Sequence, residues 1–131
     1  MTADSDLPSL DAIERMAERA LAAIPSELRQ HLADVVIRVV DLPDAETMDS
    51  MNLESPYDLL GLYHGQSLDQ QSVHDIRHHM DIIHLYRLPM LDYQRETGEP
   101  LERVVRHVLI HEVGHHFGFS DEDMTRIEGE R

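Results

Sequence analysis

The sequence predicts an α+β domain in which a small mixed β-sheet is combined with an N-terminal helix and a longer helix packed against the sheet. Three patterns support this fold class. Apolar residues recur at helical spacing between residues 10 and 24, β-branched residues concentrate in two short runs, and a wide apolar helical stripe begins after residue 100. With 131 residues, the chain fits a single domain over residues 1–131, of which about the first eight are expected to be flexible.

The first helix is predicted over residues 10–24. Ser9 suits the N-cap position, and Pro25 cannot continue the helix. The apolar face of this helix is formed by Leu10, Ile13, Met16, Ala17, Ala20, Leu21 and Ile24. A short second helical turn is expected from residue 27 to residue 32, before the first strand.

Three strands are predicted. Residues 35–40 (VVIRVV) and 81–87 (DIIHLYR) are dense in β-branched and aromatic residues, and residues 59–65 (LLGLYHG) form a shorter run closed by a glycine. Along the last strand, alternation places Ile82, His84 and Tyr86 on one face and Ile83, Leu85 and Arg87 on the other. Pro89 is expected to end it. Between the strands, residues 44–57 are expected to be a loop with a helical turn, and residues 66–79 a polar, exposed excursion.

A long helix is predicted after Gly98 and Pro100, with the proline at its first position. Its apolar residues are Leu101, Val104, Val105, Val108, Leu109, Ile110, Val113 and Phe117, and Gly118 is the expected left-handed C-cap. Residues 90–97 favour a short helix before it, and residues 121–128 a last helix after it.

Charge and composition exclude several classes of function. The formal net charge is −15, there is no lysine, and no cluster of basic residues is present, so nucleic acid and anionic membranes are unfavourable partners. No segment resembles a signal peptide or a membrane span, and we therefore expect a cytoplasmic protein. Because cysteine is absent, histidine and carboxylate side chains are the strong metal ligands that the chain offers.

The run HEVGH within the long helix predicts a metal site. His111 and His115 lie four residues apart and therefore share one helical face, close enough to bind one ion. Glu112 is rotated by about 100° from His111, so its carboxylate can take a proton from metal-bound water. A catalytic zinc site typically has three protein ligands, and Asp121 arrives three residues after Gly118 as the candidate third ligand.

The extended pattern over residues 111–121, His-Glu-x-x-His-x-x-Gly-x-x-Asp, resembles that of the minimal zincin-like metallopeptidases of bacteria. The similarity covers roughly residues 10–127 and includes LLGLYHG at 59–65, the strand and proline over 83–89, and HHFG at 115–118. The polar segment 66–79 departs from the family pattern, so contacts with a substrate are not transferred to it.

The resemblance implies a small α+β fold of the zincin type, one bound Zn²⁺ and hydrolysis of a peptide or protein substrate. In this mechanism His111, His115 and Asp121 hold the metal, and Glu112 acts as general base toward the activated water. It also implies that an extended peptide adds alongside the strand at residues 82–87. Two alternatives stay open: a binding module in which the metal only stabilises the fold, and a metal-dependent RNA-processing nuclease, which Glu112 and the negative charge disfavour.

Other histidines favour structural roles. His107 lies one turn before His111, and a buried or supporting role is expected because Val108 would occupy the position of the base in that register. His116 is expected to pack or to form a hydrogen bond. His84 and Tyr86 are expected to be a satisfied pair on one strand face rather than to assist an oxyanion. The cluster formed by His74, His78 and His79, with Asp75 and Asp81 as possible oxygen ligands, is expected to lie on the surface.

Overall fold

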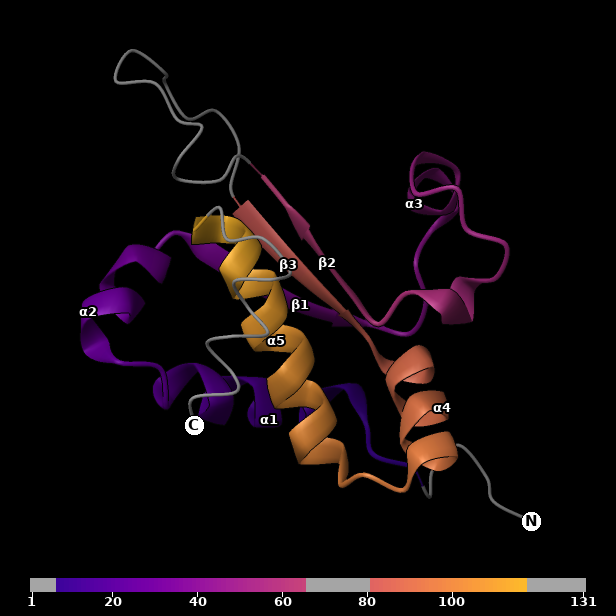
Figure 1. Ribbon diagram of the computed structural model, residues 1–131, viewed down its shortest axis with the longest axis horizontal. Helices are drawn as coiled ribbons and strands as arrows, with labels where there is room; N and C mark the ends of the chain where they lie inside the picture. Colours follow the sequence, from indigo (N-terminus) through magenta and orange to yellow (C-terminus); the bar gives the residue numbers. More distant parts are fainter. Residues whose placement is uncertain (1–6, 66–80, 118–131) are drawn as a thin grey trace.

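The computed structural model of the chain describes residues 7–65 and 81–117 (Figure 1). Its elements, in chain order, are α1 (Leu10–Ala22), α2 (Ser26–Arg29), the 3₁₀ turn η2 (Gln30–Leu32), β1 (Val35–Val40), α3 (Ala45–Ser50), the 3₁₀ turn η3 (Pro56–Asp58), β2 (Gly61–His64), β3 (Asp81–Tyr86), α4 (Arg87–Thr97) and α5 (Leu101–Phe117). Helices and a small mixed sheet confirm the α+β class. Gly118, Asp121, the histidines at 74, 78 and 79, and the predicted last helix lie outside the described residues.

The three strands form one sheet in the order β1-β3-β2. β1 is parallel to β3, with Val35 opposite Asp81, whereas β2 is antiparallel to β3, with Leu62 opposite His84. β3 is therefore the central strand, and its backbone groups pair on both sides. The expectation that a peptide adds alongside residues 82–87 is wrong for this reason. Within the described part of the chain, the outer edge of β2 pairs with no strand.

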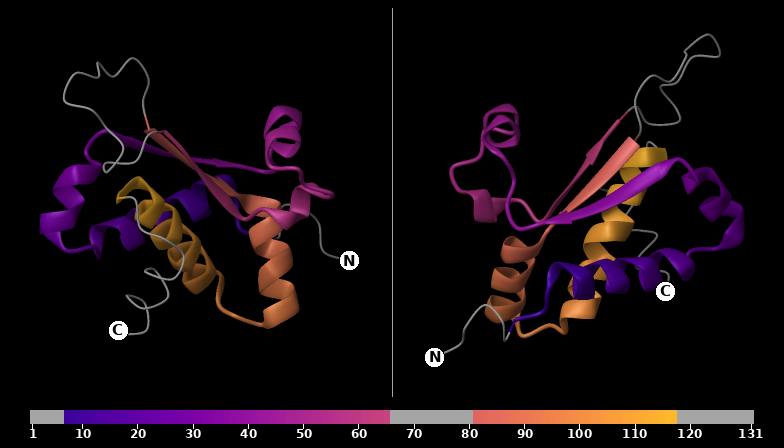
Figure 2. Two further views of the ribbon diagram at one scale, coloured as in Figure 1. Left: turned by 45° about the horizontal axis from the view of Figure 1, so that its top comes forward. Right: turned by 180° about the vertical axis from the view of Figure 1, so that it is seen from behind.

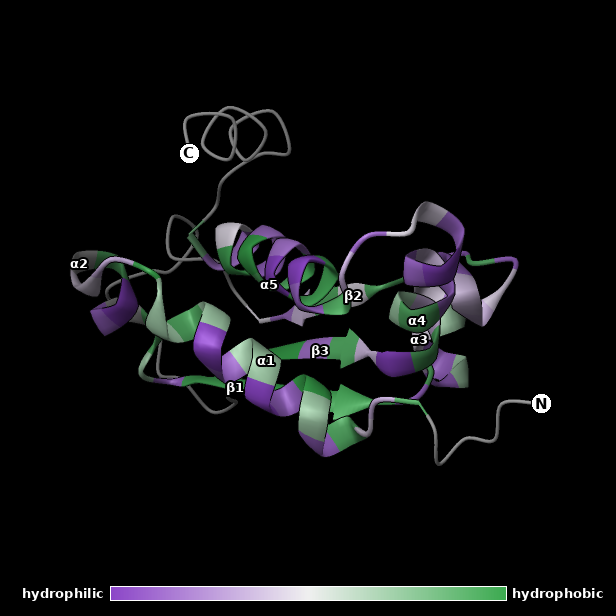
Figure 3. Cartoon of the chain, turned by 90° about the horizontal axis from the view of Figure 1, so that it is seen from below, coloured by the Kyte–Doolittle hydropathy of each residue, from purple (hydrophilic) through white to green (hydrophobic). Residues whose placement is uncertain are grey.

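Helices α1 and α5 cover one face of the sheet, which is the inner face (Figures 1 and 3). Both helices contact the sheet and each other, and their apolar stripes meet inward-facing strand residues in one core. Completely buried members of that core are Ile13 and Ala17 from α1, Ile83 and Leu85 from β3, Met90 from α4, and Val105 and Leu109 from α5. The alternation predicted for residues 82–87 is thereby confirmed up to Tyr86. Among the described helices, none is long and apolar enough to cross a membrane.

The ends of α1 follow local chemistry. The hydroxyl of Ser9 accepts a hydrogen bond from the backbone N–H of Ala12 at 3.1 Å, which confirms the predicted cap. The helix ends at Ala22, two residues before the predicted end. Ile24 nevertheless joins the core at 7% exposure. The residue before a proline avoids the helical conformation, and Pro25 therefore shortens the helix without removing Ile24 from the core.

The prediction for Pro89 is wrong. β3 ends at Tyr86, and Pro89 lies in the first turn of α4, where a missing N–H costs nothing because those groups have no partner within the helix. Arg87 begins this helix and is nearly buried. Its guanidinium forms an ion pair with Asp41 at 3.1 Å and donates to the carbonyl oxygen of Pro8 at 2.7 Å. These contacts join the start of α4 to the end of β1 and to the segment before α1.

The opposite, outer face of the sheet is bordered by α3 at one end (Figure 2). The carboxylate of Asp44 caps this short helix by accepting from the N–H of Thr47 at 2.8 Å. The same hydrogen bond lowers the pKa of Asp44. The helical turn predicted within residues 44–57 is therefore confirmed as α3, with η3 as a second, tighter turn.

Candidate metal centre

Helix α5 positions the candidate metal ligands. Its apolar stripe, which includes Val108 and Val113, is buried against the sheet and α1. This packing fixes the rotation of the helix about its axis. As a result His111 and His115 are half-buried at one edge of the packed face, whereas Glu112 is only 8% exposed.

The two histidines and the glutamate come together as the motif predicts. Each offers a ligand atom, and these three atoms lie within 4.8 Å of one another. The imidazole rings of His111 and His115 are 4.9 Å apart, at 76° to each other. Imidazole nitrogen and carboxylate oxygen are the donors that Zn²⁺ accepts where thiolates are absent, so this donor set fits a zinc ion. Asp121, the predicted third ligand, falls outside the described residues.

A glycine in β2 lets the strand approach the candidate metal centre. A Cβ at Gly61 would lie 2.6 Å from Cγ1 of Val108, 3.1 Å from the carbonyl oxygen of His84 and 3.5 Å from Cγ of Glu112. Any side chain there would push β2 away from α5. The sequence marks Gly61 only as a glycine inside a strand pattern, and its contact with the helix that carries Glu112 becomes visible in the structure.

A buried polar network lies beside the last turn of α5. Nδ1 of His116 is 3.2 Å from the hydroxyl of Tyr63 and 3.2 Å from Oδ2 of Asp81. The hydrogen-bonding role predicted for His116 is confirmed. Asp81 is fully buried in this network, so it is not the oxygen ligand at the surface that the sequence had suggested. The network ties β2 and β3 to the residue next to His115, and sequence reasoning missed the parts played in it by Tyr63 and Asp81.

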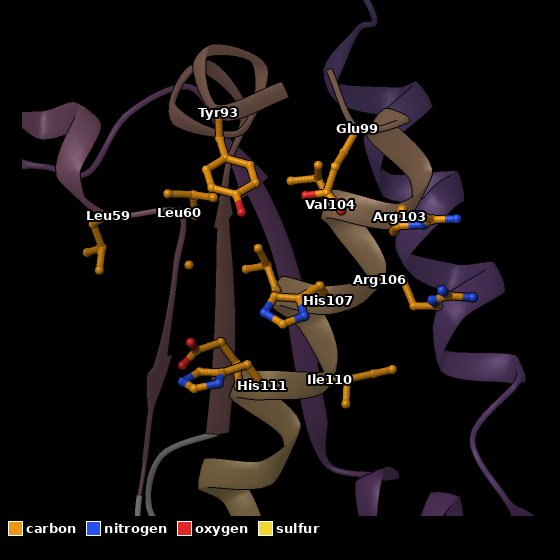
Figure 4. Close-up of a pocket in the computed structure, with 13 residues that line it drawn as sticks. Leu59, Leu60, Tyr93, Glu99, Arg103, Val104, Arg106, His107, Ile110 and His111 are labelled. Atoms are coloured by element: carbon orange, nitrogen blue, oxygen red, sulfur yellow. The ribbon is translucent and has the colours of Figure 1, made fainter. Parts of the chain in front are cut away.

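A cavity of about 840 Å³ opens beside the candidate metal centre (Figure 4). It extends from His111 and Glu112 along α5 toward α4. His107 lines it and is exposed, so of the two expected roles the buried one is wrong, and the supporting one stays a prediction. The remaining lining residues are Leu59, Leu60, Gly61, Tyr93, Glu99, Arg103, Val104, Arg106, Val108 and Ile110. Its size falls within the range of about 300–1,000 Å³ that is typical of ligand pockets.

A second histidine pair lies on the outer face of the sheet. His64 and His84 have ring centroids 5.0 Å apart, and the ring of His84 is parallel to that of Tyr86 at 6.0 Å. These rings line a separate groove with Asp44 and Thr47, so His84 and Tyr86 do not face the candidate metal centre. Nδ1 of His84 is buried without a hydrogen-bond partner among the described residues, and the expected pair is therefore not fully satisfied.

Burial shifts the pKa values on this outer face. The pKa of His84 is lowered first by burial and then by the nearby charges of His64 and Arg38, with Asp44 opposing. The pKa of Tyr86 is raised, mainly by burial. Both shifts favour the neutral forms of these side chains.

The fold and the site together define a small α+β protein with a candidate metal-binding group on one helix. A family model described as zincin-like metallopeptidase matches residues 32–131, and the chain belongs to this family. The matched range includes all three strands and the helix that carries His111, Glu112 and His115. Among curated proteins, no match to this chain was found.

Proposed function

We propose that the protein is a zinc-dependent peptidase in which His111, His115 and Asp121 hold one Zn²⁺. The observation that carries this proposal is the convergence of His111, Glu112 and His115 on α5, with ligand atoms within 4.8 Å. Membership of the zincin-like metallopeptidase family supports hydrolysis as the reaction.

When bound, zinc would supply a more acidic water molecule and polarise the scissile carbonyl group. The two imidazoles would hold the ion at the edge of α5 through their ring nitrogens. The carboxylate of Glu112 accepts a proton from the attacking water and later delivers it to the leaving amine nitrogen. Its burial suits this role, because a base with few competing water contacts is held in one orientation.

The substrate backbone fits best along β2. This strand packs against α5, and its outer edge is unpaired among the residues that the structure describes. Because Gly61 allows close contact between the two elements, a peptide hydrogen-bonded to β2 would pass near Glu112. This location replaces the one expected from the central strand.

The variant Glu112→Gln tests the proposal. It removes the base while keeping the size of the side chain, so turnover of a peptide library should fall by at least about 1,000-fold while zinc content stays unchanged. Glu102→Gln, on the exposed side of α5, is the matched control and should retain activity. Absence of cleavage by the zinc-loaded unmodified protein would reject the peptidase. Equal cleavage by the Glu112→Gln and Glu102→Gln variants would reject it as well.

The same preparation separates the alternative functions. A binding module with a structural metal would contain zinc, melt at a lower temperature after chelation and cleave no peptide. A nuclease would degrade RNA in the presence of zinc. The net charge of −15 disfavours the nuclease, since RNA backbones are repelled.

A further inference from the structure

The cavity next to the candidate metal centre has an apolar wall as well as polar side chains, among them Glu99 and His107. Leu59 and Leu60 contribute from the segment that leads into β2, and Val104 and Val108 contribute from α5. Tyr93 contributes from α4, and Figure 4 shows its ring directed into the same space. Three separate elements therefore bound this space, and one end of it is formed by His111 and Glu112.

The arginines at the rim do not make this a charged cavity. Figure 4 shows the side chains of Arg103 and Arg106 directed away from Leu59, Leu60 and Tyr93. Both arginines also line a second cavity, where Arg19 and Glu102 form an ion pair at 3.0 Å. Their guanidinium groups thus belong to the side of α5 that faces α1. A ligand beside Tyr93 meets the carbon atoms of Leu59, Leu60 and Val104, with the polar side chains of Glu99 and His107 on the α5 side.

Tyr93 stands out among the wall residues because it is a large aromatic side chain that stays 40% exposed. An exposed aromatic ring beside an apolar wall gains contact area when a second ring or a large aliphatic group enters. A charged side chain entering the same space would lose hydration, and an acidic one would in addition approach the carboxylates of Glu99 and Glu112.

We propose that this cavity holds one large apolar side chain of the substrate, next to the bond that is cleaved, and that Tyr93 is the residue that makes an aromatic side chain the best fit. The substrate class is then peptides with phenylalanine, or less well leucine or methionine, beside the scissile bond. This inference rests on the proposed peptidase function. Measurements of ligand binding can nevertheless test it without catalysis.

The probes are hydroxamate-capped dipeptide amides that differ in one side chain: alanine, leucine, phenylalanine, aspartate or lysine. Their affinities for the zinc-loaded full chain are measured by calorimetry. We expect phenylalanine to bind at least about tenfold more tightly than alanine, because burial of a large apolar side chain contributes that much. The aspartate probe should bind no better than the alanine probe.

Two tyrosine variants provide a matched comparison. Tyr93→Ala should reduce the preference for phenylalanine over alanine by about fivefold, through loss of the ring contact. Tyr57→Ala is the control, because Tyr57 is exposed to a similar extent, 43% against 40%, but does not line the cavity. Affinity for the alanine probe should change little in either variant.

The outcomes separate this proposal from the proposed function. Tight phenylalanine binding that depends on Tyr93, without cleavage of any peptide, would support the cavity and reject the peptidase. Cleavage with no side-chain preference would support the peptidase and reject the proposed role of the cavity. A preference for lysine, equal affinities for all probes, equal effects of the two tyrosine variants, or no hydroxamate binding would each overturn the assignment of this cavity.

Discussion

Two histidine pairs with nearly the same ring geometry lie on different parts of this small protein. His111 and His115 have centroids 4.9 Å apart at 76°, and His64 and His84 have centroids 5.0 Å apart at 86°. The first pair is made by one helical turn, the second by diagonal neighbours on two antiparallel strands. In the described part of the chain, only the first belongs to a group of three ligand atoms.

The difference shows that a close imidazole pair is not by itself a metal site. Beside His111, the next residue of the same helix, Glu112, adds a carboxylate to the group, which the proposed function uses as the base next to the ion. The groove around the outer pair is lined by the carboxylates of Asp44 and Glu46, and that of Asp44 already accepts the N–H of Thr47. That hydrogen bond lowers the pKa of Asp44 and serves α3 as a cap. Among the described residues, the outer pair thus has no third ligand atom close enough to complete a group.

The largest expected effect is on zinc affinity. His111→Ala should weaken zinc binding by more than about 100-fold, because it removes one of the three proposed protein ligands. The double variant His64→Ala/His84→Ala should keep the affinity of the unmodified protein. Competition with a zinc chelator measures both constants, and an equal loss in both variants would show that the outer pair also binds zinc.

A gain of binding should follow when the outer pair is given its missing ligand. Leu62 faces the same side as His84, its partner across the strands. In a protein that lacks both His111 and His115, Leu62→His should therefore bind zinc about tenfold or more tightly than the parent. Leu62→Gln in the same background is the control, and no gain over it would contradict this explanation.

A moderate effect is expected at Gly61, where β2 contacts α5. Gly61→Ala places a Cβ 2.6 Å from Val108 and should destabilise the fold by about 1–3 kcal/mol, with weaker zinc binding as β2 moves from α5. Gly98→Ala is the control, because a Cβ at Gly98 would have no atom within 4 Å. Its only expected cost is the strained backbone at a φ of +76°, which should destabilise the fold by about 1 kcal/mol. Denaturant unfolding and zinc titration compare the two variants. Lower zinc affinity in Gly98→Ala as well would contradict an effect that is specific to the contact between β2 and α5.

The smallest expected effect is the pH dependence contributed by His84. Its pKa in the folded protein is lowered from 6.5, so the unfolded chain binds the proton first as the pH falls. The stability that His84 contributes is therefore complete above about pH 6.5 and is lost as the pH falls toward the lowered value. In metal-free protein, His84→Gln should show a weaker loss of stability between pH 7.5 and pH 5 than the parent. A steeper loss of stability in the variant would contradict a lowered pKa of His84 in the folded protein.

Local patterns were sufficient for most of the secondary structure. The cap at Ser9, the strand at residues 35–40 and the helix after Pro100 follow from side-chain chemistry and periodicity within a few residues, and the structure confirms them. Pro89 was misplaced because a proline suits both a strand end and a first helical turn. Local sequence cannot distinguish these two settings. In the structure the chain turns into α4 at Arg87, where the ion pair with Asp41 joins the start of the helix to the end of β1.

The sequence alone determined that His111, Glu112 and His115 would share one edge of a helix, because the 3.6-residue period makes that arrangement a property of spacing. Only the tertiary structure decided that β3 is central, that β2 is the edge strand packed against α5, and that Tyr63 and Asp81 join His116. It also decided that Tyr93 borders a cavity beside Glu112. Strand order and contacts between distant residues depend on how whole elements bury their apolar faces together, and no short segment of the sequence encodes that packing.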